Sequence, residues 1–192
     1  NVYGYEDIRQ PGFTTVSLFV VGPDGVLVAD GQGSPEATKK LLDAIARVTP
    51  KPVKWYIVGS DHGDHTAGNA VLPRDITFVV SKASKAQMKI DAPAMTSDKK
   101  VINVGGIEVQ ALYLGRAHTG GDLLVYLPKQ KILFMSEVFL NRVFPAMRSA
   151  FPSEWVSVID KALKLDVDRF VPGHGFIEEP KVSREELIEY QD

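Results

Sequence analysis

The chain has 192 residues, 44% of them hydrophobic, and sets 22 lysines and arginines against 24 aspartates and glutamates. The net charge of −2 argues against nucleic acid or an anionic membrane as a partner, because no basic field attracts phosphate groups. The absence of cysteine excludes disulfides, thiolate metal sites and thiol nucleophiles. A transition metal would therefore be held by histidine and carboxylate side chains.

The length fits one domain over residues 1–192. No apolar run approaches the roughly 18 residues that cross a bilayer, so we expect no membrane partner. The chain begins at Asn1 rather than methionine and stops at Asp192 within an expected helix, which favours trimming at both ends. A removed secretory signal would place the protein in the periplasm or outside the cell, and otherwise we expect it in the cytoplasm. The oligomeric state is left open.

The first half of the chain alternates short apolar runs with one long stretch of helical periodicity. Runs rich in β-branched residues predict strands, and the turn sequence at residues 22–25 predicts a hairpin between the first two. Ser34 followed by Pro35 is placed to begin a helix in which apolar residues recur at helical spacing. In chain order the predicted elements are strands 14–21 and 26–29, a helix 34–50, a strand 53–58, a polar loop 59–69, a strand 76–80 and a helix 81–88.

The second half is richer in strands. Residues 105–106 and 128–130 are turn sequences between apolar runs, so each predicts a hairpin. Ser153 and Ser183 are placed to cap two helices, the second with Glu186 at the capping-box position. The predicted elements are strands 101–104, 107–114, 123–127 and 132–135, a helix 154–165, a strand 169–171 and a final helix from 183. Alternating hairpins and helices favour stacked sheets with helices outside over one parallel sheet.

The four histidines, His62, His65, His118 and His174, all lie beside glycine in loops that follow predicted strands. Glycine lets the backbone turn sharply, so imidazoles at strand ends can converge on one edge of a sheet. His62 and His118 would then serve one metal site, and Asp64, His65 and His174 a second. Nitrogen ligands with one carboxylate suit zinc, with iron and manganese as alternatives. Scattered loop histidines are the competing interpretation, against which the clustering argues.

The polar loop resembles a known metal-binding signature. Residues 60–69, which read Ser-Asp-His-Gly-Asp-His-Thr-Ala-Gly-Asn, are similar to the His-x-His-x-Asp-His motif of the metallo-β-lactamase superfamily. Three later segments are similar to that family's second histidine, bridging-acid and last histidine segments, namely residues 115–122, 134–137 and 172–175. The resemblance covers nearly the whole chain. It implies an α/β fold, a four-layer αββα sandwich of two mixed β-sheets flanked by helices, with a metal site where the loops gather.

Two positions depart from the family pattern. Ser60 stands where the first histidine of the signature is expected, and Glu137 where the bridging aspartate is expected. A serine hydroxyl is a poor zinc ligand beside imidazole, so the resemblance implies a weakened first site with Ser60 at its third position. Glu137, one methylene longer than aspartate, could bridge the two sites or bind a single metal. We therefore expect one or two zinc ions.

The resemblance and the ligand types together predict a metal-dependent hydrolase. A bound metal lowers the pKa of water from about 16 towards about 7, which supplies a nucleophile at neutral pH. Asp64 would orient that water or carry its proton, and the small-molecule substrate would contain a β-lactam, lactone or related ester bond. The alternative is a non-catalytic or degenerate metal-binding member of the same fold. The expected metal ligands are His62, Asp64, His65, His118, Glu137 and His174.

The segment after Glu137 carries the candidate substrate-binding residues. It mixes aromatic side chains with arginine, so Asn141, Arg142 and Phe144 could wall an apolar pocket that binds an anion. Arg116, two residues before His118, could orient an acidic substrate or pair with a carboxylate. An ordinary packed connector explains the same segment equally well.

Overall fold

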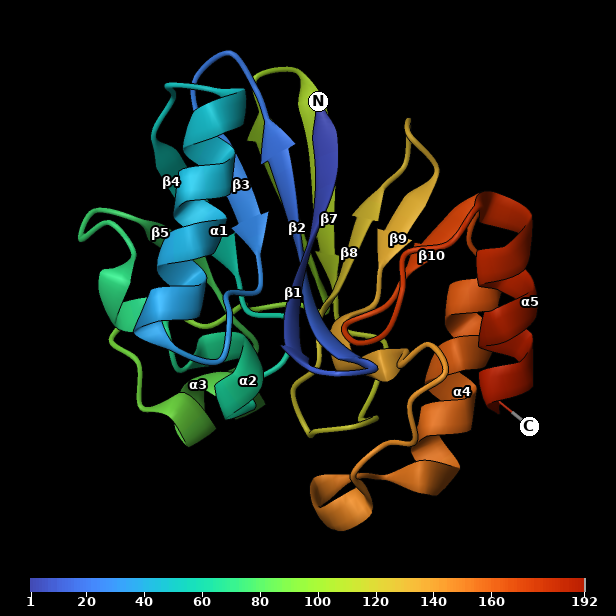
Figure 1. Cartoon of the computed structure of the whole chain (residues 1–192). Helices are drawn as coiled ribbons and strands as arrows, with labels where there is room; N and C mark the ends of the chain where they lie inside the picture. The colour runs from blue at the N-terminus through green and yellow to red at the C-terminus, as the bar shows by residue number, and fades with distance from the viewer. Residues whose placement is uncertain (192) are drawn as a thin grey trace.

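The structure, a computed structural model, describes residues 1–191 and folds them into two five-stranded sheets (Figure 1). The first sheet has the order β1 (Val2–Gln10), β2 (Phe13–Val21), β3 (Val26–Ala29), β4 (Val53–Ile57) and β5 (Thr77–Val79). The second has the order β10 (Arg169–Val171), β9 (Ile132–Phe134), β8 (Leu124–Leu127), β7 (Ile107–Leu112) and β6 (Lys99–Val104).

Both sheets are mixed. In the first, β1, β2 and β3 pair antiparallel, whereas β3, β4 and β5 pair in parallel. In the second, only β9 and β10 pair in parallel, and the pairs among β6, β7, β8 and β9 are antiparallel. Two mixed sheets flanked by helices are the architecture that the sequence predicted, and that prediction is confirmed.

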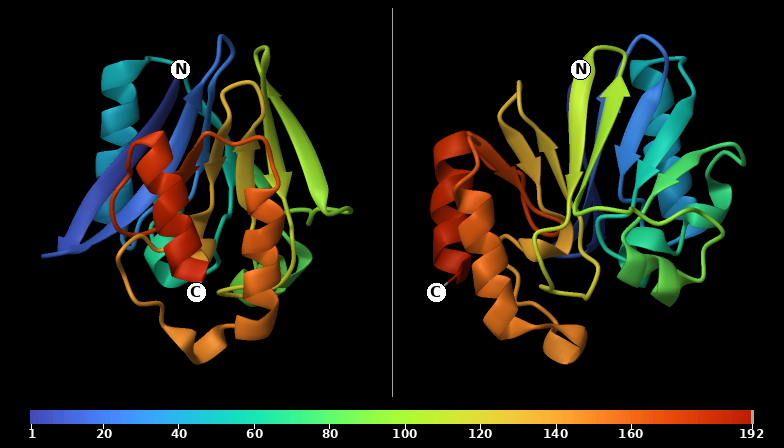
Figure 2. Two further views of the ribbon diagram at one scale, coloured as in Figure 1. Left: turned by 90° about the vertical axis from the view of Figure 1, so that its right-hand side faces the viewer. Right: turned by 180° about the vertical axis from the view of Figure 1, so that it is seen from behind.

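The longer helices cover the outer faces of the two sheets. Helix α1 (Pro35–Val48) lies over the first sheet, and α4 (Pro152–Leu163) and α5 (Pro180–Gln191) lie over the second (Figures 1 and 2). The shorter helices α2 (Gly63–Thr66) and α3 (Lys82–Met88) lie at the lower end of the first sheet in Figure 1. Three single turns complete the set, η1 (Asn69–Val71), η2 (Ser136–Val138) and η3 (Met147–Ser149).

Strand β2 shows why its sequence is apolar almost throughout. Val16, Leu18 and Val20 belong to the cluster between the two sheets, whereas Phe19 belongs to the cluster under α1. Successive side chains of a strand point to opposite faces, so a strand buried on both faces needs apolar residues at nearly every position. The predicted strands were recognisable for this reason.

Helix α1 is capped as its sequence predicts. The side chain of Ser34 accepts a hydrogen bond from the backbone N–H of Ala37 at 3.1 Å, and Pro35 occupies the first helical position. Leu41 and Ile45 face the first sheet and are buried. The helix ends at Val48, two residues before the expected limit at Pro50.

Four sequence-based expectations need correction. β1 was not predicted, because this edge strand is mostly exposed and mixes polar with apolar residues. Helix α4 begins at Pro152 after Phe151, so Ser153 lies inside it and is not its cap. Helix α5 begins at Pro180, and Ser183 lies within it, accepting from the backbone N–H of Phe170. The polar loop 59–69 contains the helical turn α2 and the start of η1.

The parallel strand pairs determine where the loops gather. β3 and β4 of one sheet and β9 and β10 of the other end towards the lower side of the molecule in Figure 1. The segments that follow these strands, and the β7–β8 loop, therefore meet at one edge. No helix within residues 1–191 is both long and apolar enough to span a membrane.

Candidate metal centre

The six predicted ligands meet at this edge, and each follows a strand. His62, Asp64 and His65 follow β4, His118 lies in the β7–β8 loop, Glu137 follows β9 in η2, and His174 follows β10. Their side chains form two groups that share Glu137. Within each group the potential ligand atoms all lie within 4.8 Å of one another; the groups are Asp64, His65, Glu137 and His174, and His62, His118 and Glu137.

The larger group centres on His174. Its Nε2 lies 3.1 Å from Nε2 of His65, 3.1 Å from Oδ2 of Asp64 and 3.3 Å from Oε1 of Glu137. In the smaller group, Nδ1 of His62 lies 2.8 Å from Oε2 of Glu137, and Nε2 of His118 lies 3.3 Å from Oε1 of the same carboxylate. Glu137 thus contacts both groups, because Oε2 faces His62 while Oε1 lies near both His118 and His174.

These atoms fit a divalent transition metal by their chemistry. Imidazole nitrogens that face each other at 3.1 Å, as in His65 and His174, share a proton or point at a common cation. Four imidazoles with two carboxylates are the ligand types of zinc, iron and manganese sites. Except for His62 and Asp64, which are half-buried, the ligands are buried, so the set is shielded from bulk water.

Asp30 is a component of the centre that the sequence analysis did not select. It follows β3, is fully buried, and its Oδ2 lies 3.0 Å from Nδ1 of His65. A carboxylate on the second ring nitrogen fixes the tautomer and the ring orientation of a metal-binding histidine. Asp30 could have been noticed as the acid that ends a buried strand parallel to the strand before His62 and His65.

Asp30 also holds the two ligand-bearing loops together. Its Oδ1 accepts from the backbone N–H of Gly59 at 2.6 Å, and its Oδ2 accepts from the hydroxyl of Ser136. Asp30 and Ser136 both have positive φ, 58° and 49°. A side chain at position 59 would place its Cβ 2.8 Å from Asp30 Oδ2 and from Ser136 Cβ. Glycine at this position is therefore required by the close approach of the two loops.

Two other ligands are oriented by their second ring nitrogen. Nδ1 of His174 lies 2.7 Å from the backbone oxygen of Thr14, so it donates there and leaves Nε2 for the metal. Nε2 of His62 lies 3.0 Å from the hydroxyl of Ser149 in η3. The loop after Glu137 therefore contacts the centre through Ser149, a residue that the sequence analysis did not name.

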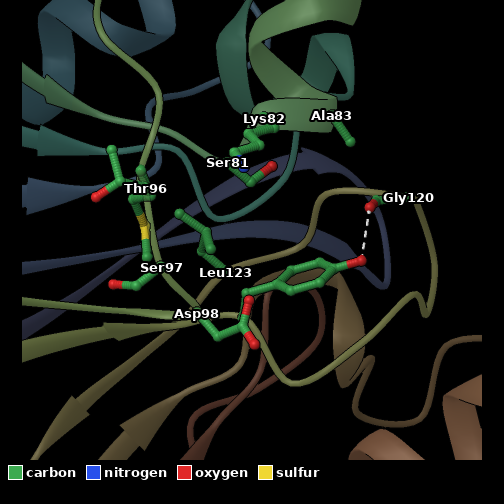
Figure 3. Close-up of a pocket in the computed structure, with 10 residues that line it drawn as sticks. Ser81, Lys82, Ala83, Thr96, Ser97, Asp98, Gly120 and Leu123 are labelled. Carbon is green, nitrogen blue, oxygen red and sulfur yellow. Dashed lines mark hydrogen bonds between the residues drawn. The ribbon is translucent and has the colours of Figure 1, made fainter.

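The loop that carries His118 is pinned by its neighbours. Asp122 accepts from the backbone N–H and the hydroxyl of Thr119, each at 2.7 Å. The hydroxyl of Tyr113 donates to the backbone oxygen of Gly120 at 3.2 Å across a pocket of about 180 Å³ beside this loop (Figure 3). Ser84 of α3 donates to the backbone oxygen of Gly121. His118 is thereby held at the edge of the sheets.

The carboxylates and imidazoles shift one another's pKa values. Burial raises the pKa of Glu137, but hydrogen bonds from His118, His174 and His62 outweigh this effect and hold it well below its usual range. The hydrogen bond to Glu137 raises the pKa of His62 to about 8. Burial lowers the pKa of His174, but hydrogen bonds to Asp64 and Glu137 raise it to about 9. These contacts favour the protonated forms of His62 and His174 at neutral pH.

A hairpin closes one side of the centre. The ring of Phe13 stacks on His174, with centroids 4.6 Å apart, and the guanidinium of Arg9 lies 5.4 Å from the centroid of the Phe13 ring. Nη1 of Arg9 donates to Oδ2 of Asp64 at 2.9 Å. The tip between β1 and β2 thus brings a half-exposed cation to a predicted metal ligand.

The predicted substrate-binding residues have partners other than the six predicted metal ligands. Arg116 pairs with Glu154, and Arg142 pairs with Glu186 at 2.6 Å and with Glu178. Asn141 is buried and donates to the backbone oxygen of Phe176, while Phe144 is 90% exposed and lines a pocket of about 460 Å³ beside α4 and α5. A role in substrate binding stays a prediction for all four, Arg116, Asn141, Arg142 and Phe144.

Comparisons with known proteins agree with this geometry. The family model described as "Metallo-beta-lactamase superfamily" matches residues 10–174. The chain is 27% identical over 169 residues to the 2,4-dinitroanisole O-demethylase subunit alpha of Nocardioides sp. (strain JS1661), covering 82% of this chain and 52% of that protein. It is 24% identical over 165 residues to the metallo-beta-lactamase type 2 of Bacillus cereus, covering 79% of this chain and 63% of that protein. The chain thus spans less than two thirds of the length of each relative.

The fold is also that of a solved structure. A metallo-beta-lactamase from Pontibacter korlensis superposes with a TM-score of 0.82 at 22% identity, over 100% of this chain and 94% of that one. At this identity the likeness establishes the shared fold and leaves the substrate open.

The orienting role of Asp30 is testable by the variant Asp30→Asn. The amide can still accept from Gly59, but it replaces one carboxylate oxygen that faces His65 and Ser136, so we expect zinc affinity to fall about 10- to 100-fold. Competition with a chromophoric chelator measures the change. Asp24→Asn, on the exposed turn after β2, is the matched control, and an unchanged affinity in Asp30→Asn would show that Asp30 does not orient His65.

The raised histidine pKa values predict proton release on metal binding. At pH 7 His62 and His174, with pKa values of about 8 and 9, carry protons that must leave before a metal binds. We expect protons to be released at pH 7, fewer at pH 9.5, and zinc affinity that rises between these values. Titration calorimetry in buffers of different ionisation enthalpy counts the protons. Equal release at both pH values would contradict the assigned protonation.

Proposed function

Because the chain belongs to the metallo-β-lactamase superfamily of metal-dependent hydrolases, we propose that it hydrolyses a β-lactam, lactone or related ester bond in a small molecule. The observation that carries the proposal is the sharing of Glu137 between two groups of ligand atoms, each gathered within 4.8 Å. The net charge of −2 supports a small-molecule substrate rather than nucleic acid.

The ligand set favours zinc, with iron and manganese as alternatives. His62, His118 and Glu137 would hold one ion, and Asp64, His65, His174 and Glu137 would hold the other. A metal at these positions would activate a water molecule as nucleophile and polarise the carbonyl oxygen that it attacks. The chain supplies no cysteine for this task.

Asp64 is the proposed catalytic residue of the chain. Its Oδ2 is held between Arg9 and His174, at 2.9 and 3.1 Å. Burial raises the pKa of Asp64, but the hydrogen bond with His174 and the charges of His65 and His174 together outweigh burial and lower it to about 2. Asp64 therefore stays ionised at neutral pH, and its carboxylate orients the attacking water as a hydrogen-bond acceptor.

Arg9 is the proposed contact for an anionic group of the substrate. Its side chain is 40% exposed, and only Nη1 donates to Asp64. The remaining guanidinium N–H groups are donors beside the centre. They suit a carboxylate of the substrate or the negative charge that develops as the carbonyl is attacked.

A substrate panel tests the proposed reaction. The zinc-loaded chain should hydrolyse at least one of nitrocefin, an aryl acetate and a lactone, and an aryl ether is included because one relative is a 2,4-dinitroanisole O-demethylase subunit. Asp64→Asn should lower kcat/KM about 100-fold or more. Asp61→Asn, on the same loop but outside both ligand groups, is the control and should stay close to wild type. A zinc-bound chain without turnover would favour the degenerate, non-catalytic alternative.

The variant Arg9→Ala tests substrate orientation. Loss of a charge-assisted hydrogen bond should raise KM about 10-fold or more for nitrocefin, which carries a carboxylate, and much less for a neutral lactone. Steady-state kinetics on both substrates measures the difference. Arg47→Ala, in the last turn of α1, is the control. Equal changes for both substrates would exclude an anion-binding role for Arg9.

A further inference from the structure

The two residues that depart from the family pattern are in contact. Ser60 is fully buried, and its hydroxyl donates a hydrogen bond to Oε2 of Glu137 at 2.5 Å. The same hydroxyl accepts from the backbone N–H of His62 at 3.3 Å. Because its proton is committed to a carboxylate, Ser60 acts on Glu137 as a donor.

Glu137 reaches into both ligand groups. Its side chain is 5% exposed, its Oε2 lies 2.8 Å from Nδ1 of His62, and its Oε1 lies 3.3 Å from Nε2 of both His118 and His174. The group with His62 and His118 contains no other acid or histidine in the part of the chain that the structure describes. Any cation at this group would therefore meet Glu137 as its third protein ligand.

The two departures compensate for each other in size. A histidine at position 60 would put an imidazole where the buried hydroxyl of Ser60 now contacts the carboxylate. Serine leaves that space to the carboxylate, and the extra methylene of glutamate lets the carboxylate extend to it. The hydroxyl then fixes the rotamer of a flexible side chain, which lowers the conformational entropy lost when a metal binds.

We propose that the buried hydroxyl of Ser60 is a positioning group that holds Glu137 within reach of His62 and His118, so that the first metal site is complete without a third histidine. The site is then a set of two histidines and one carboxylate, a type that binds zinc, iron or manganese with open positions for water and substrate. Ser60 is a positioning residue for Glu137. Position 60 therefore contributes to the first metal site although it supplies no metal ligand. The inference rests on the proposed metal-dependent function, but its test measures metal binding.

A cycle of substitutions tests the pairing. The metal-free chain of 192 residues and its variants Ser60→His, Glu137→Asp and Ser60→His/Glu137→Asp are titrated with Zn²⁺, and bound metal is measured after equilibrium dialysis. We expect the wild type to bind two Zn²⁺ and Ser60→His to bind no more than that. Glu137→Asp should lose the site formed with His62 and His118, which has fewer protein ligands than the other site, because the shorter acid withdraws from His62. The double variant should regain it.

The hydroxyl of Ser60 is tested by two further variants. Ser60→Ala should lower the Zn²⁺ affinity of the site with His62 and His118 about 10- to 100-fold, and Ser60→Thr, which keeps a hydroxyl, should restore that affinity. Absorption spectra of the Co²⁺-loaded chain provide a second readout, because loss of a ligand changes the coordination number. Glu154→Asp, an exposed acid paired with Arg116, is the control and should change nothing. Tight binding of the first equivalent of Zn²⁺ shows that each variant is folded.

Three results would overturn the inference. Wild type with one Zn²⁺ and Ser60→His with two would show that position 60 is a vacant ligand position. Two sites of unchanged affinity in Glu137→Asp would show that the reach of Glu137 is not needed. Equal metal affinities in Ser60→Ala and wild type would remove the role of Ser60. In each case hydrolysis by a metal-loaded wild type would leave the proposed function standing, whereas a chain that binds no metal would end both.

Discussion

The buried carboxylate of Asp30 is the interaction on which the arrangement of the centre depends. It follows β3 of the first sheet and receives hydrogen bonds from Gly59 after β4 and from Ser136 after β9 of the second sheet, while it faces His65. Loss of these partners would leave a buried charge unpaired, which would lower the stability of the fold. The hydrogen bonds of Asp30 therefore fix the position of the two sheets relative to each other at this edge. The ligand-bearing loops are thereby fixed before any metal binds.

Around this anchor, the centre balances charge within a buried space. Two carboxylates, Asp64 and Glu137, are surrounded by four imidazoles. The raised pKa values of His62 and His174 reflect hydrogen bonds from these rings to the carboxylates, made by the same nitrogen atoms that would bind a metal. A metal ion and protons therefore compete for the same histidine nitrogen atoms. Glu137 links the two halves of the centre, since its oxygens contact ligands of both groups.

Much of the fold could be predicted because several strands, such as β2, β3 and β8, are buried on both faces and the turns contain glycine and proline. The hairpin at Gly105 and Gly106, where both residues have positive φ, and the cap of α1 at Ser34 are local features that a sequence displays directly. β1 could not be predicted in the same way, since an edge strand with one exposed face has a weak apolar pattern. The first residues of α4 and α5 were also missed, because serine can lie inside a helix when its hydroxyl finds a partner there, as that of Ser183 does.

The sequence by itself determined the kinds of ligand and their distribution over strand ends. Histidine and aspartate beside glycine, directly after a predicted strand, form a local pattern that can be recognised without knowing how the strands pack. It also showed the absent histidine at Ser60 and the long acid at Glu137. Only the tertiary structure decided that these two residues touch, that Asp30 orients His65, and that Arg9 reaches Asp64 from a hairpin 55 positions away. Such contacts join residues distant in the chain, so they follow from the packing of the two sheets and not from any local pattern.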